Sequence, residues 1–373
     1  MDSSIATQIK KAPVRVWVDG CFDMMHFGHA NALRQAKELG DYLIVGVHSD
    51  VEIEKNKGPC VMHEDERYIA VSACKWVDQV VKDAPYVTSL EVLQKYNVDF
   101  VVHGDDITTA ADGTDCYQEV KDAGKYKEVK RTEGVSTTEI VGRMLLFTKD
   151  HLQLTSKTDD SLNIDNSKMS DFSKDNVLDR NTGVHHYLST SKKIVQFSSG
   201  KEPKKGDRVV YVDGGFDLFH AGHIEFLKKA KEQGDFLLVG IHDDRTVNRV
   251  KGGSFPVMNL QERVLGVLQC RYVDEVIIGA PYSVTSDVLN SVYKVGVVAH
   301  GPDMPTLDLN GSDPYSLPKE LGIYKQVDHN LSSLTTSSII ERVIESRQRY
   351  IDRQKRKMEK AKLESQLELQ KSE

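Results

Sequence analysis

The pattern His-x-Gly-His occurs twice in this chain, as His26–His29 and as His220–His223. Each copy follows a short β-branched run that predicts a strand, and each precedes a segment with helical spacing. The imidazoles therefore fall at a helix N-terminus, where unpaired N–H groups and the helix dipole favour an anion such as phosphate. Histidines there can donate hydrogen bonds to phosphate oxygens as charge develops in a transition state. Gly28 allows a bulky ligand to approach the backbone closely.

Two other interpretations of the motif compete with phosphate binding. A metal site is the weaker one, because no third His, Cys or carboxylate lies at the usual ligand spacing of a zinc site. A single His-x-Gly-His would most often be a helix cap or a pair of core histidines. The recurrence of the motif in matching strand–helix contexts favours a functional role.

The similarity between the two halves extends far beyond the motif. GDYLIVGVHSD matches GDFLLVGIHDD, ERYIAVSACKWVDQVV matches ERVLGVLQCRYVDEVI, APYVTSLEVL matches APYSVTSDVL, and GTDCY matches GSDPY. The spacing between matched residues drifts by only a few positions, and the repeated unit is much longer than a solenoid repeat. We therefore predict a duplicated domain, with copies at residues 12–150 and 206–345.

Two segments lie outside these copies. Residues 151–205 include a run rich in Ser, Asp, Asn and Lys, which predicts a flexible polar linker rather than a surface loop of a single domain. Residues 346–373 predict a charged helix. Its apolar positions are sparse, which favours a solvated or weakly coiled helix over a membrane-surface helix with a large apolar face.

Strand and helix patterns alternate within each copy. This alternation predicts the α/β class, with two tandem doubly wound, Rossmann-like domains built on parallel sheets. Ligands of such sheets bind beyond the carboxyl ends of the strands, and His103 follows a later strand at the same edge as His26 and His29. In the first copy we predict strands at 14–20, 41–47, 79–84 and 99–104 and helices at 29–39, 65–77 and 89–96.

Composition bounds the class of protein and its compartment. The chain has 373 residues, 39% hydrophobic and 28% charged, and a net charge of −7 that gives no reason to expect nucleic-acid binding. Five cysteines without a C-x-x-C pair indicate reduced thiols, not a disulfide framework. The N-terminus has no signal-peptide pattern, and no run approaches the ~20 apolar residues that span a bilayer. We expect a cytoplasmic protein, at most peripheral to the endoplasmic reticulum membrane.

The motifs carry a family resemblance. His-x-Gly-His after a first strand, with RTEGVSTT near the end of the domain, resembles the cytidylyltransferases of the nucleotidyltransferase superfamily. Two copies joined by a linker resemble the CTP:phosphoethanolamine cytidylyltransferases, and the match covers roughly residues 14–345. The resemblance implies that CTP and phosphoethanolamine are the substrates, that CDP-ethanolamine and pyrophosphate are the products, and that Mg²⁺ accompanies CTP. No metal site built by the protein alone is expected.

The same resemblance implies roles for individual residues. His26 and His29 would stabilise the α-phosphate and the leaving pyrophosphate, Lys57 would bridge the phosphates of both substrates, and Arg131 and Thr132 would bind the triphosphate. Asp19 would accept the ammonium group, with Tyr86 and Tyr117 as walls. The residues expected around CTP are Cys21, Phe22, His29, Lys57, His103, Asp105, Arg131, Thr132 and Thr137 in the first copy, and Gly215, Phe216, His220, His223, Lys251, His300, Gly301, Asp303, Thr335 and Thr336 in the second.

Each of these assignments has a purely structural alternative. Lys57 fits a solvated loop lysine, Arg131 a capping or surface arginine, and Tyr86 a core residue. The GVSTT run also reads as a helix start with Ser136 or Thr137 as N-cap. That interpretation is compatible with phosphate binding, because phosphates bind at helix N-termini.

The second copy departs from the first near its end. RTEGVSTT becomes HNLSSLTT, so a cation for the triphosphate is missing, and His103-Gly104-Asp105-Asp106 becomes His300-Gly301-Pro302-Asp303. Loss of such a charge-assisted bond costs on the order of 1.5–3 kcal/mol. We therefore predict a second pocket with a supporting, nucleotide-binding or regulatory role.

Two alternatives for function stay open at the level of sequence. The same chemistry could act on phosphocholine or glycerol 3-phosphate, or the fold could serve as a non-catalytic nucleotide sensor. Retention of both histidines, Lys57 and Arg131 argues against the sensor. Oligomeric state is also open, because two copies in one chain could replace a homodimer or form one.

Overall fold

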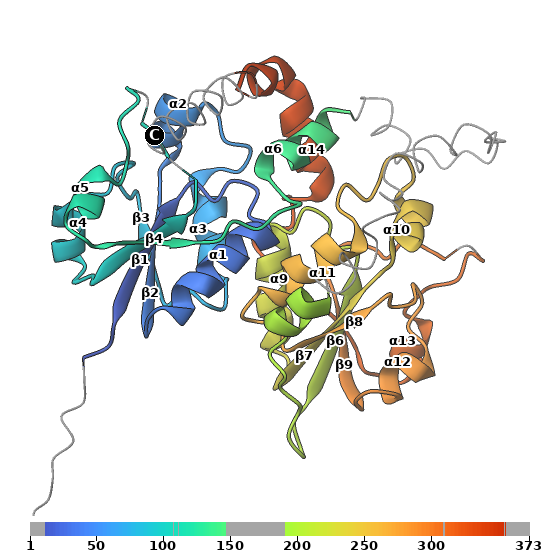
Figure 1. Cartoon of the computed structure of the whole chain (residues 1–373). Coiled ribbons are helices and arrows are strands. Elements are labelled where there is room, and N and C mark those ends of the chain that lie inside the picture. The colour runs from blue at the N-terminus through green and yellow to red at the C-terminus, as the bar shows by residue number, and fades with distance from the viewer. Residues whose placement is uncertain are drawn as a thin grey trace, which may run out of the picture. The chain divides into compact units, whose positions relative to one another are not determined.

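The structure is a computed structural model that describes residues 12–106, 108–110, 112–146, 191–308, 310–353 and 355 (Figure 1). Contacts divide these residues into two compact units. Unit 1 comprises residues 12–22, 28–134 and 355, and unit 2 comprises residues 23–27, 135–146, 191–308 and 310–353. The units do not coincide with the two copies, because parts of the first copy belong to unit 2.

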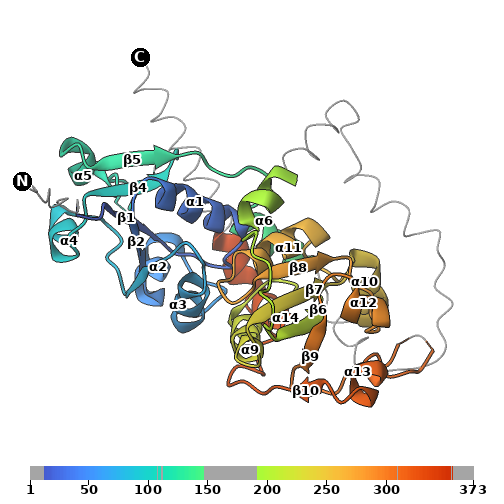
Figure 2. The same ribbon diagram turned by 90° about the horizontal axis from the view of Figure 1, so that it is seen from below.

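The first copy forms a five-stranded parallel sheet in the order β3-β2-β1-β4-β5. Helices α4 and α5 cover one face of this sheet, and α1 and α3 cover the other (Figures 1 and 2). The strand order reverses at β1, so the fold class predicted from the alternating pattern is confirmed. The elements are β1 (Arg15–Gly20), α1 (Phe27–Glu38), β2 (Tyr42–Val47), α2 (Asp50–Lys57), α3 (Glu64–Ser72), β3 (Gln79–Lys82), α4 (Leu90–Lys95), β4 (Phe100–Gly104), α5 (Gln118–Asp122), β5 (Tyr126–Val129) and α6 (Thr137–Leu145).

The second copy repeats this architecture with the sheet order β10-β9-β6-β7-β8, again parallel. Helices α9 and α11 lie on one face of this sheet and α12 and α13 on the other (Figure 2). Helix α14 packs against α6 within unit 2. The elements are β6 (Val209–Gly214), α9 (Ala221–Lys231), β7 (Phe236–Ile241), α10 (Asp244–Lys251), α11 (Leu260–Leu268), β8 (Glu275–Ile278), α12 (Ser286–Asn290), β9 (Val295–His300), α13 (Ser316–Glu320), β10 (Tyr324–Gln326) and α14 (Thr336–Glu345).

The central strands are buried on both faces, as their continuous apolar runs predict. All six residues of β7 and all but the first of β2 are buried. Gly46 in β2 is required by packing, because a Cβ there would lie 2.5 Å from the Trp17 ring. In the same way, a Cβ at Gly240 in β7 would lie 2.3 Å from the Tyr211 hydroxyl oxygen. These aromatic rings anchor the apolar clusters on one side of each sheet.

Several expected boundaries differ from the structure. The helix predicted at 65–77 ends at Ser72, because the chain turns there towards β3. The helix predicted at 29–39 ends at Glu38, and Leu39, just beyond it, is 39% exposed. In the first copy, helices α2 and α5 and strand β5 were not predicted.

The predicted linker and the C-terminal segment are described only in part. Most of the linker, including its Ser- and Asp-rich run, lies outside the described residues, and residues 191–197 within the predicted linker are helical. In the C-terminal segment residues 347–353 are helical, with Tyr350 only 4% exposed. At least one residue of the segment predicted to be a solvated or weakly coiled helix is therefore buried.

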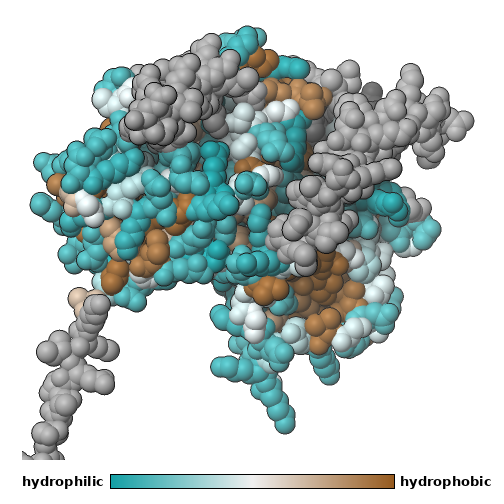
Figure 3. Space-filling view, viewed as in Figure 1, coloured by the Kyte–Doolittle hydropathy of each residue, from teal (hydrophilic) through white to brown (hydrophobic). Residues whose placement is uncertain are grey.

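The surface is mostly hydrophilic on the face seen in Figure 3, with apolar residues gathered in small areas. The most exposed large apolar side chains, Met304, Val51, Val195 and Leu146, come from separate parts of the sequence. Among the residues that the structure describes, no helix combines the length and the apolar character needed to cross a membrane.

Candidate nucleotide-binding and catalytic site

Asp19, at the end of β1, is the centre of a buried hydrogen-bond network in unit 1. Its carboxylate accepts hydrogen bonds from Trp17 Nε1 at 3.1 Å, from the Thr88 hydroxyl and from Tyr117 OH at 2.5 Å. Burial, reinforced by the charge of Asp19, raises the pKa of Tyr117 well above its usual value, so its hydroxyl stays protonated and donates. Three of about four acceptor positions of Asp19 are thus occupied by the protein.

Lys57 and Tyr86 lie together beside this network. Lys57 is the last residue of α2, followed by Gly58 with a φ of 88°, and its exposed ammonium lies 5.6 Å from the centre of the Tyr86 ring. Burial raises the pKa of Tyr86 to about 12, with Lys57 opposing the shift. The Tyr86 hydroxyl has no hydrogen-bond partner within the described part of the chain. Lys57 is therefore a helix-end lysine, not a loop lysine, and a phosphate could draw it off the ring.

Two histidines lie at the carboxyl ends of β2 and β4: His48 directly follows β2, and His103 is the next-to-last residue of β4. The rings of His48 and Tyr86 are 5.0 Å apart, and those of His103 and Tyr117 are 4.7 Å apart. Burial lowers the pKa of both histidines, with Asp19 opposing the shift in each case. Both imidazoles therefore stay neutral at pH 7 and are hydrogen-bonding groups without charge at this end of the sheet.

Arg131 lies at the exposed rim of the first copy. Its Nη1 donates to Asp106 Oδ2 at 3.0 Å, and its backbone N–H donates to Asp105 Oδ1 at 3.1 Å. Both side chains of the ion pair are about half exposed, which makes the pair weak and exchangeable. Beside it, Thr132 Oγ1 accepts from Asn31 Nδ2 at 2.9 Å. The guanidinium is positioned by an acidic turn that a triphosphate could replace as its partner.

The motif of the first copy contributes residues to both units. Cys21, Phe22 and His29 belong to unit 1, with the rings of Phe22 and His29 5.7 Å apart. His26 and Thr137 belong to unit 2, where His26 is 7% exposed and Thr137 Oγ1 donates to the Asp23 carbonyl at 3.0 Å. Ser136 caps α6 by accepting from Glu139 N, so the predicted helix start is confirmed.

The second motif lies wholly in unit 2 and shows the histidine geometry directly. His220 caps α9 by accepting the Gly222 N–H at its Nδ1, 3.2 Å away, and the His220 N–H approaches His223 Nδ1 at 3.4 Å. The two rings stack with centroids 3.8 Å apart. Burial lowers the pKa of His220 to about 3 and that of His223 well below its usual value.

These contacts fix the protonation of the pair. A neutral imidazole that accepts at Nδ1 carries its proton on Nε2. His220 and His223 are therefore neutral Nε2–H donors, and His220 Nε2 has no partner within the described residues. Hydrogen bonding to an anion is the chemistry that such donors supply at a helix N-terminus.

The glycine between these histidines has a packing role. A Cβ at Gly222 would lie 2.6 Å from the Leu334 carbonyl oxygen and 3.0 Å from the His220 ring. Thr336 Oγ1 donates to the Asp217 carbonyl at 2.9 Å, and Thr335 caps α14 by accepting from Ser338 N. Of the two threonines expected to bind the ligand, Thr335 thus caps α14, and Thr336 holds the motif turn, as Thr137 does in the first copy.

The carboxylate network of the second copy has two donors fewer among the described residues. Tyr315 OH donates to Asp213 Oδ1 at 2.5 Å, but Val284 stands where the first copy has Thr88. Asp213 Oδ2 and the Tyr211 hydroxyl are buried without a hydrogen-bond partner in the described part of the chain. Burial raises the pKa of Asp213, with His242 and the Tyr315 hydrogen bond opposing the shift.

The remaining predicted residues of the second copy come from the end of α10, from the end of β9 and from the segments that follow β6, β9 and β10. Lys251 ends α10, and its ammonium lies 5.7 Å from the Phe255 ring centre. His300 ends β9, and its ring lies 4.8 Å from that of Tyr315. His329, which stands near the position of the absent arginine, is partly buried, and burial lowers its pKa. Gly215 and Phe216 form the turn after β6, Gly301 follows β9, and Asp303 is exposed beyond it.

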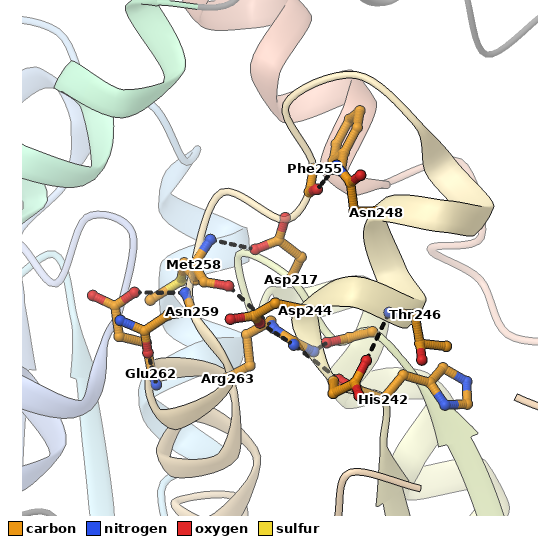
Figure 4. Close-up of polar contacts among 12 residues, drawn as sticks. Asp217, His242, Asp244, Thr246, Asn248, Phe255, Met258, Asn259, Glu262 and Arg263 are labelled. Carbon is orange, nitrogen blue, oxygen red and sulfur yellow. Dashed lines mark hydrogen bonds and ion pairs between the residues drawn. The ribbon is translucent and has the colours of Figure 1, made fainter. Parts of the chain in front are cut away.

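Two buried arginines that support these sites were missed by sequence reasoning. Arg263 donates to the carbonyls of Met258, Gly215 and His242 at 3.1, 2.6 and 2.8 Å and pairs with Asp244 (Figure 4). Arg67 makes the corresponding contacts to Met62, Cys21 and Asp50 in unit 1. Both are at most 1% exposed. The Glu-Arg pair shared by both copies was the signal that could have revealed them.

These arginines hold the turn that begins each motif. The Cys21 and Gly215 carbonyls lie directly after β1 and β6, so their position sets where the following turn begins. In the second copy Asp217, within this turn, is also held in place, because its carboxylate accepts the Val257 and Met258 N–H groups at 2.7 and 2.9 Å (Figure 4). The chain from β6 to α9 is therefore fixed by buried polar contacts.

Among the described residues, no group of three His, Cys, Asp or Glu side chains could hold a metal ion. Mg²⁺ is compatible with such a site, because it retains waters and binds through substrate phosphates rather than in all-protein cages.

Comparisons with known proteins agree with this geometry. The family model "Cytidylyltransferase-like" matches residues 17–143 and 211–342. The chain is 55% identical to the ethanolamine-phosphate cytidylyltransferase of Dictyostelium discoideum over 95% of this chain and 97% of that one. It is 51% identical to the mouse ethanolamine-phosphate cytidylyltransferase over 92% and 89%. Choline-phosphate cytidylyltransferase 2 of Arabidopsis thaliana is 48% identical, but over only 38% of this chain and 47% of that one. Because the higher identity extends through both copies, the chain belongs to the ethanolamine-phosphate cytidylyltransferase family.

Proposed function

We propose that this chain transfers the cytidylyl group of CTP to phosphoethanolamine, forming CDP-ethanolamine and pyrophosphate. The observation that carries the proposal is the similarity to ethanolamine-phosphate cytidylyltransferases through both copies and nearly the full length of each chain. The alternative acceptor phosphocholine is disfavoured, because the choline-phosphate relative matches little more than a third of the chain. A nucleotide sensor is disfavoured by the same family membership.

The reaction is a direct displacement at phosphorus. A phosphate oxygen of phosphoethanolamine forms a bond to the α-phosphorus of CTP, and the bond between that phosphorus and the α,β-bridging oxygen breaks. Pyrophosphate leaves with the bond electrons, and no covalent enzyme intermediate is required. Catalysis therefore depends on positioning and on stabilisation of charge.

We assign these tasks to residues of the first copy. His26 and His29 would donate hydrogen bonds to the oxygens that gain charge, by analogy with the matching pair His220 and His223. Lys57 would exchange its contact with the Tyr86 ring for the phosphates of both substrates. Arg131 would exchange Asp106 for the β- and γ-phosphates. Mg²⁺, when bound with CTP, would neutralise triphosphate charge.

Recognition of the acceptor would involve Asp19. Its remaining acceptor position could receive a hydrogen bond from a primary ammonium group, whereas a trimethylated head group has no hydrogen to donate. Tyr117 holds the Asp19 carboxylate in place, and Tyr86 offers a ring face to the cation. We expect selection of phosphoethanolamine over phosphocholine on this basis.

The test is release of pyrophosphate by the purified protein with CTP and Mg²⁺. Phosphoethanolamine, phosphocholine and glycerol 3-phosphate are supplied separately, and EDTA is added in a parallel series. We expect phosphoethanolamine to give the highest kcat/KM and EDTA to abolish release. Equal kcat/KM for phosphoethanolamine and phosphocholine would contradict the proposed acceptor. A cytoplasmic location, peripheral contact with the endoplasmic reticulum and homodimer formation also remain proposals, tested by cell fractionation and light scattering.

A further inference from the structure

The C-terminal segment beyond the matched family model reaches the motif turn of the first copy. Arg353, in the helix at 347–353, places its Nη1 3.0 Å from Asp23 Oδ2. The side chain of Asp23 is 2% exposed and that of Arg353 is 16% exposed, so this ion pair is shielded from solvent. The family model ends at residue 342, and Tyr350 anchors the intervening segment by being buried.

Asp23 belongs to a turn whose backbone is under strain. Phe22 and Met24, on either side of it, both have a φ of 50°, a left-handed conformation that residues other than glycine rarely adopt. Such a turn persists only when surrounding contacts determine it. Because Asp23 lies three residues before His26, contacts to Asp23 set the direction in which the chain approaches that histidine.

The second copy provides an internal comparison for this turn. Phe216 and Leu218 have the same left-handed φ, 48° and 49°, on either side of Asp217. Thr336 donates to the Asp217 carbonyl just as Thr137 donates to the Asp23 carbonyl. The two turns therefore share their backbone conformation and their threonine anchor.

The cation on the carboxylate distinguishes the two turns. Asp217 accepts the Val257, Met258 and Leu218 N–H groups. Within the described residues no ion pair reaches the Asp217 carboxylate, whereas Asp23 has Arg353. The copy that retains the complete RTEGVSTT motif is thus also the copy whose motif turn is held by the C-terminal helix.

We propose that Arg353 is a positioning residue for the first copy: it holds the turn that carries His26 through the Asp23 carboxylate. The helix at 347–353 then helps to position a residue of the first site. The catalytic part of this inference rests on the proposed cytidylyl transfer. The part that concerns the turn does not.

Removal of the arginine should loosen the turn specifically. It would remove the charge-assisted bond between Arg353 and the buried Asp23 carboxylate, and a bond of this kind is worth roughly one to two decades in an equilibrium or rate. The test compares wild type, Arg353→Ala, Arg353→Lys, Asp23→Asn and the Asp23→Asn/Arg353→Ala double variant. The control is Arg347→Ala, an exposed arginine of the same helix.

Two measurements separate this inference from the proposed function. The first is amide hydrogen exchange of the full-length variants without substrate, followed in peptides that cover residues 20–27 and, as a reference, β7 and α11. We expect Arg353→Ala to speed exchange at 20–27 about tenfold and to leave the reference peptides unchanged. Arg353→Lys should recover most of the protection, and Arg347→Ala should match wild type.

The second measurement is steady-state kinetics. We expect kcat to fall roughly 10- to 100-fold in Arg353→Ala with a KM for CTP near that of wild type, and the double variant to be no worse than the single ones. Unchanged exchange at 20–27, faster exchange throughout unit 2, or strictly additive effects of the two substitutions would each overturn the inference. An inactive wild type would refute the proposed function alone, because the exchange result would still stand.

Discussion

Arg143 of α6 donates hydrogen bonds to both carboxylate oxygens of Glu262 in α11, at 2.7 and 3.0 Å, although the two residues come from different copies of the repeat. The same carboxylate accepts the Asn259 N–H in the capping box of α11. Glu262 is 5% exposed in its side chain, whereas Arg143 also reaches the half-exposed Glu139. One buried carboxylate therefore joins the last helix of the first copy to the body of the second.

We predict that Glu262→Gln lowers the free energy of unfolding of unit 2 by roughly 1.5–3 kcal/mol, because the bidentate charge-assisted pair is lost and the capping contact is weakened. Thermal and urea unfolding measure the change. The matched control is Glu139→Gln, which removes the exposed partner of the same arginine and should cost less than about 0.5 kcal/mol. Equal losses for the two variants would show that burial of Glu262 contributes nothing.

A second prediction concerns His29. We expect His29→Ala to lower kcat far more than it raises the KM for CTP, because the imidazole should act on charge that appears only in the transition state. A loss of about 10²–10³ in kcat is the scale for one such donor. Initial-rate kinetics with varied CTP give both constants.

The control for this variant is His63→Ala, an exposed histidine of unit 1 outside the site. It should retain wild-type kinetics. A His29→Ala enzyme with normal kcat and only weakened CTP affinity would assign the residue to ground-state binding.

Periodicity and repetition predicted much of the fold. The continuous apolar run of β2 predicted a strand buried on both faces, and Ser136 before an apolar helical pattern predicted the start of α6. Both are confirmed, because such patterns report local geometry and burial directly. The repeat predicted two equivalent sheets, and each has the same strand order with its first strand at the centre.

Long-range polar contacts could not be predicted in this way. Arg67 and Arg263 look like ordinary charged residues near a helix start. Yet Arg67 is buried against two backbone carbonyls and a carboxylate, and Arg263 against three carbonyls and a carboxylate, and most of these partners lie far away in sequence. Tyr350 and Arg353 lie in a segment with few apolar residues, and their partners become evident only in three dimensions. The catalytic roles of the motif residues stay predictions, since the structure gives their positions and not their chemistry.

A third prediction follows from the low pKa of His220. Its folded value of about 3 lies below the ordinary 6.5, so the unfolded chain binds the proton more readily than the folded one. Stability is then fully present above pH 6.5 and falls as pH decreases from 6.5 towards 3. Through this single histidine, acidification from pH 7 to pH 5 should lower the free energy of unfolding by about 2 kcal/mol.

The measurement is chemical unfolding of wild type and His220→Gln at each pH from 5 to 7. The variant should lose less stability on acidification by that amount. The nearby groups are Lys251, Arg342, His329 and His223, together with the buried Asp217, whose raised pKa favours the folded state as pH falls. These groups are present in both proteins and largely cancel in the difference. Identical pH profiles would mean that His220 takes up a proton in the folded state.

The last prediction contrasts the two pockets. Arg131→Ala should lower kcat/KM by roughly one to two decades, because it removes the guanidinium that we assign to binding the β- and γ-phosphates. Arg131→Lys should recover part of this loss, since it restores the charge without the planar geometry. His223→Ala should retain more activity, because the second copy already has His329 and Asn330 where the first has its arginine.

A change at His223 could also act through packing, because its ring stacks on His220 and on Phe219. Kinetics must therefore be paired with thermal unfolding, and His223→Gln provides a variant of similar size that keeps a polar end. Suppose that His223→Gln unfolds like wild type but abolishes turnover as completely as Arg131→Ala. The second pocket would then be catalytic or strictly coupled to the first, and a supporting role would be wrong. If instead the variant keeps turnover but binds CTP with lower stoichiometry, the neutral Nε2–H donors of the second copy hold a nucleotide that is not consumed.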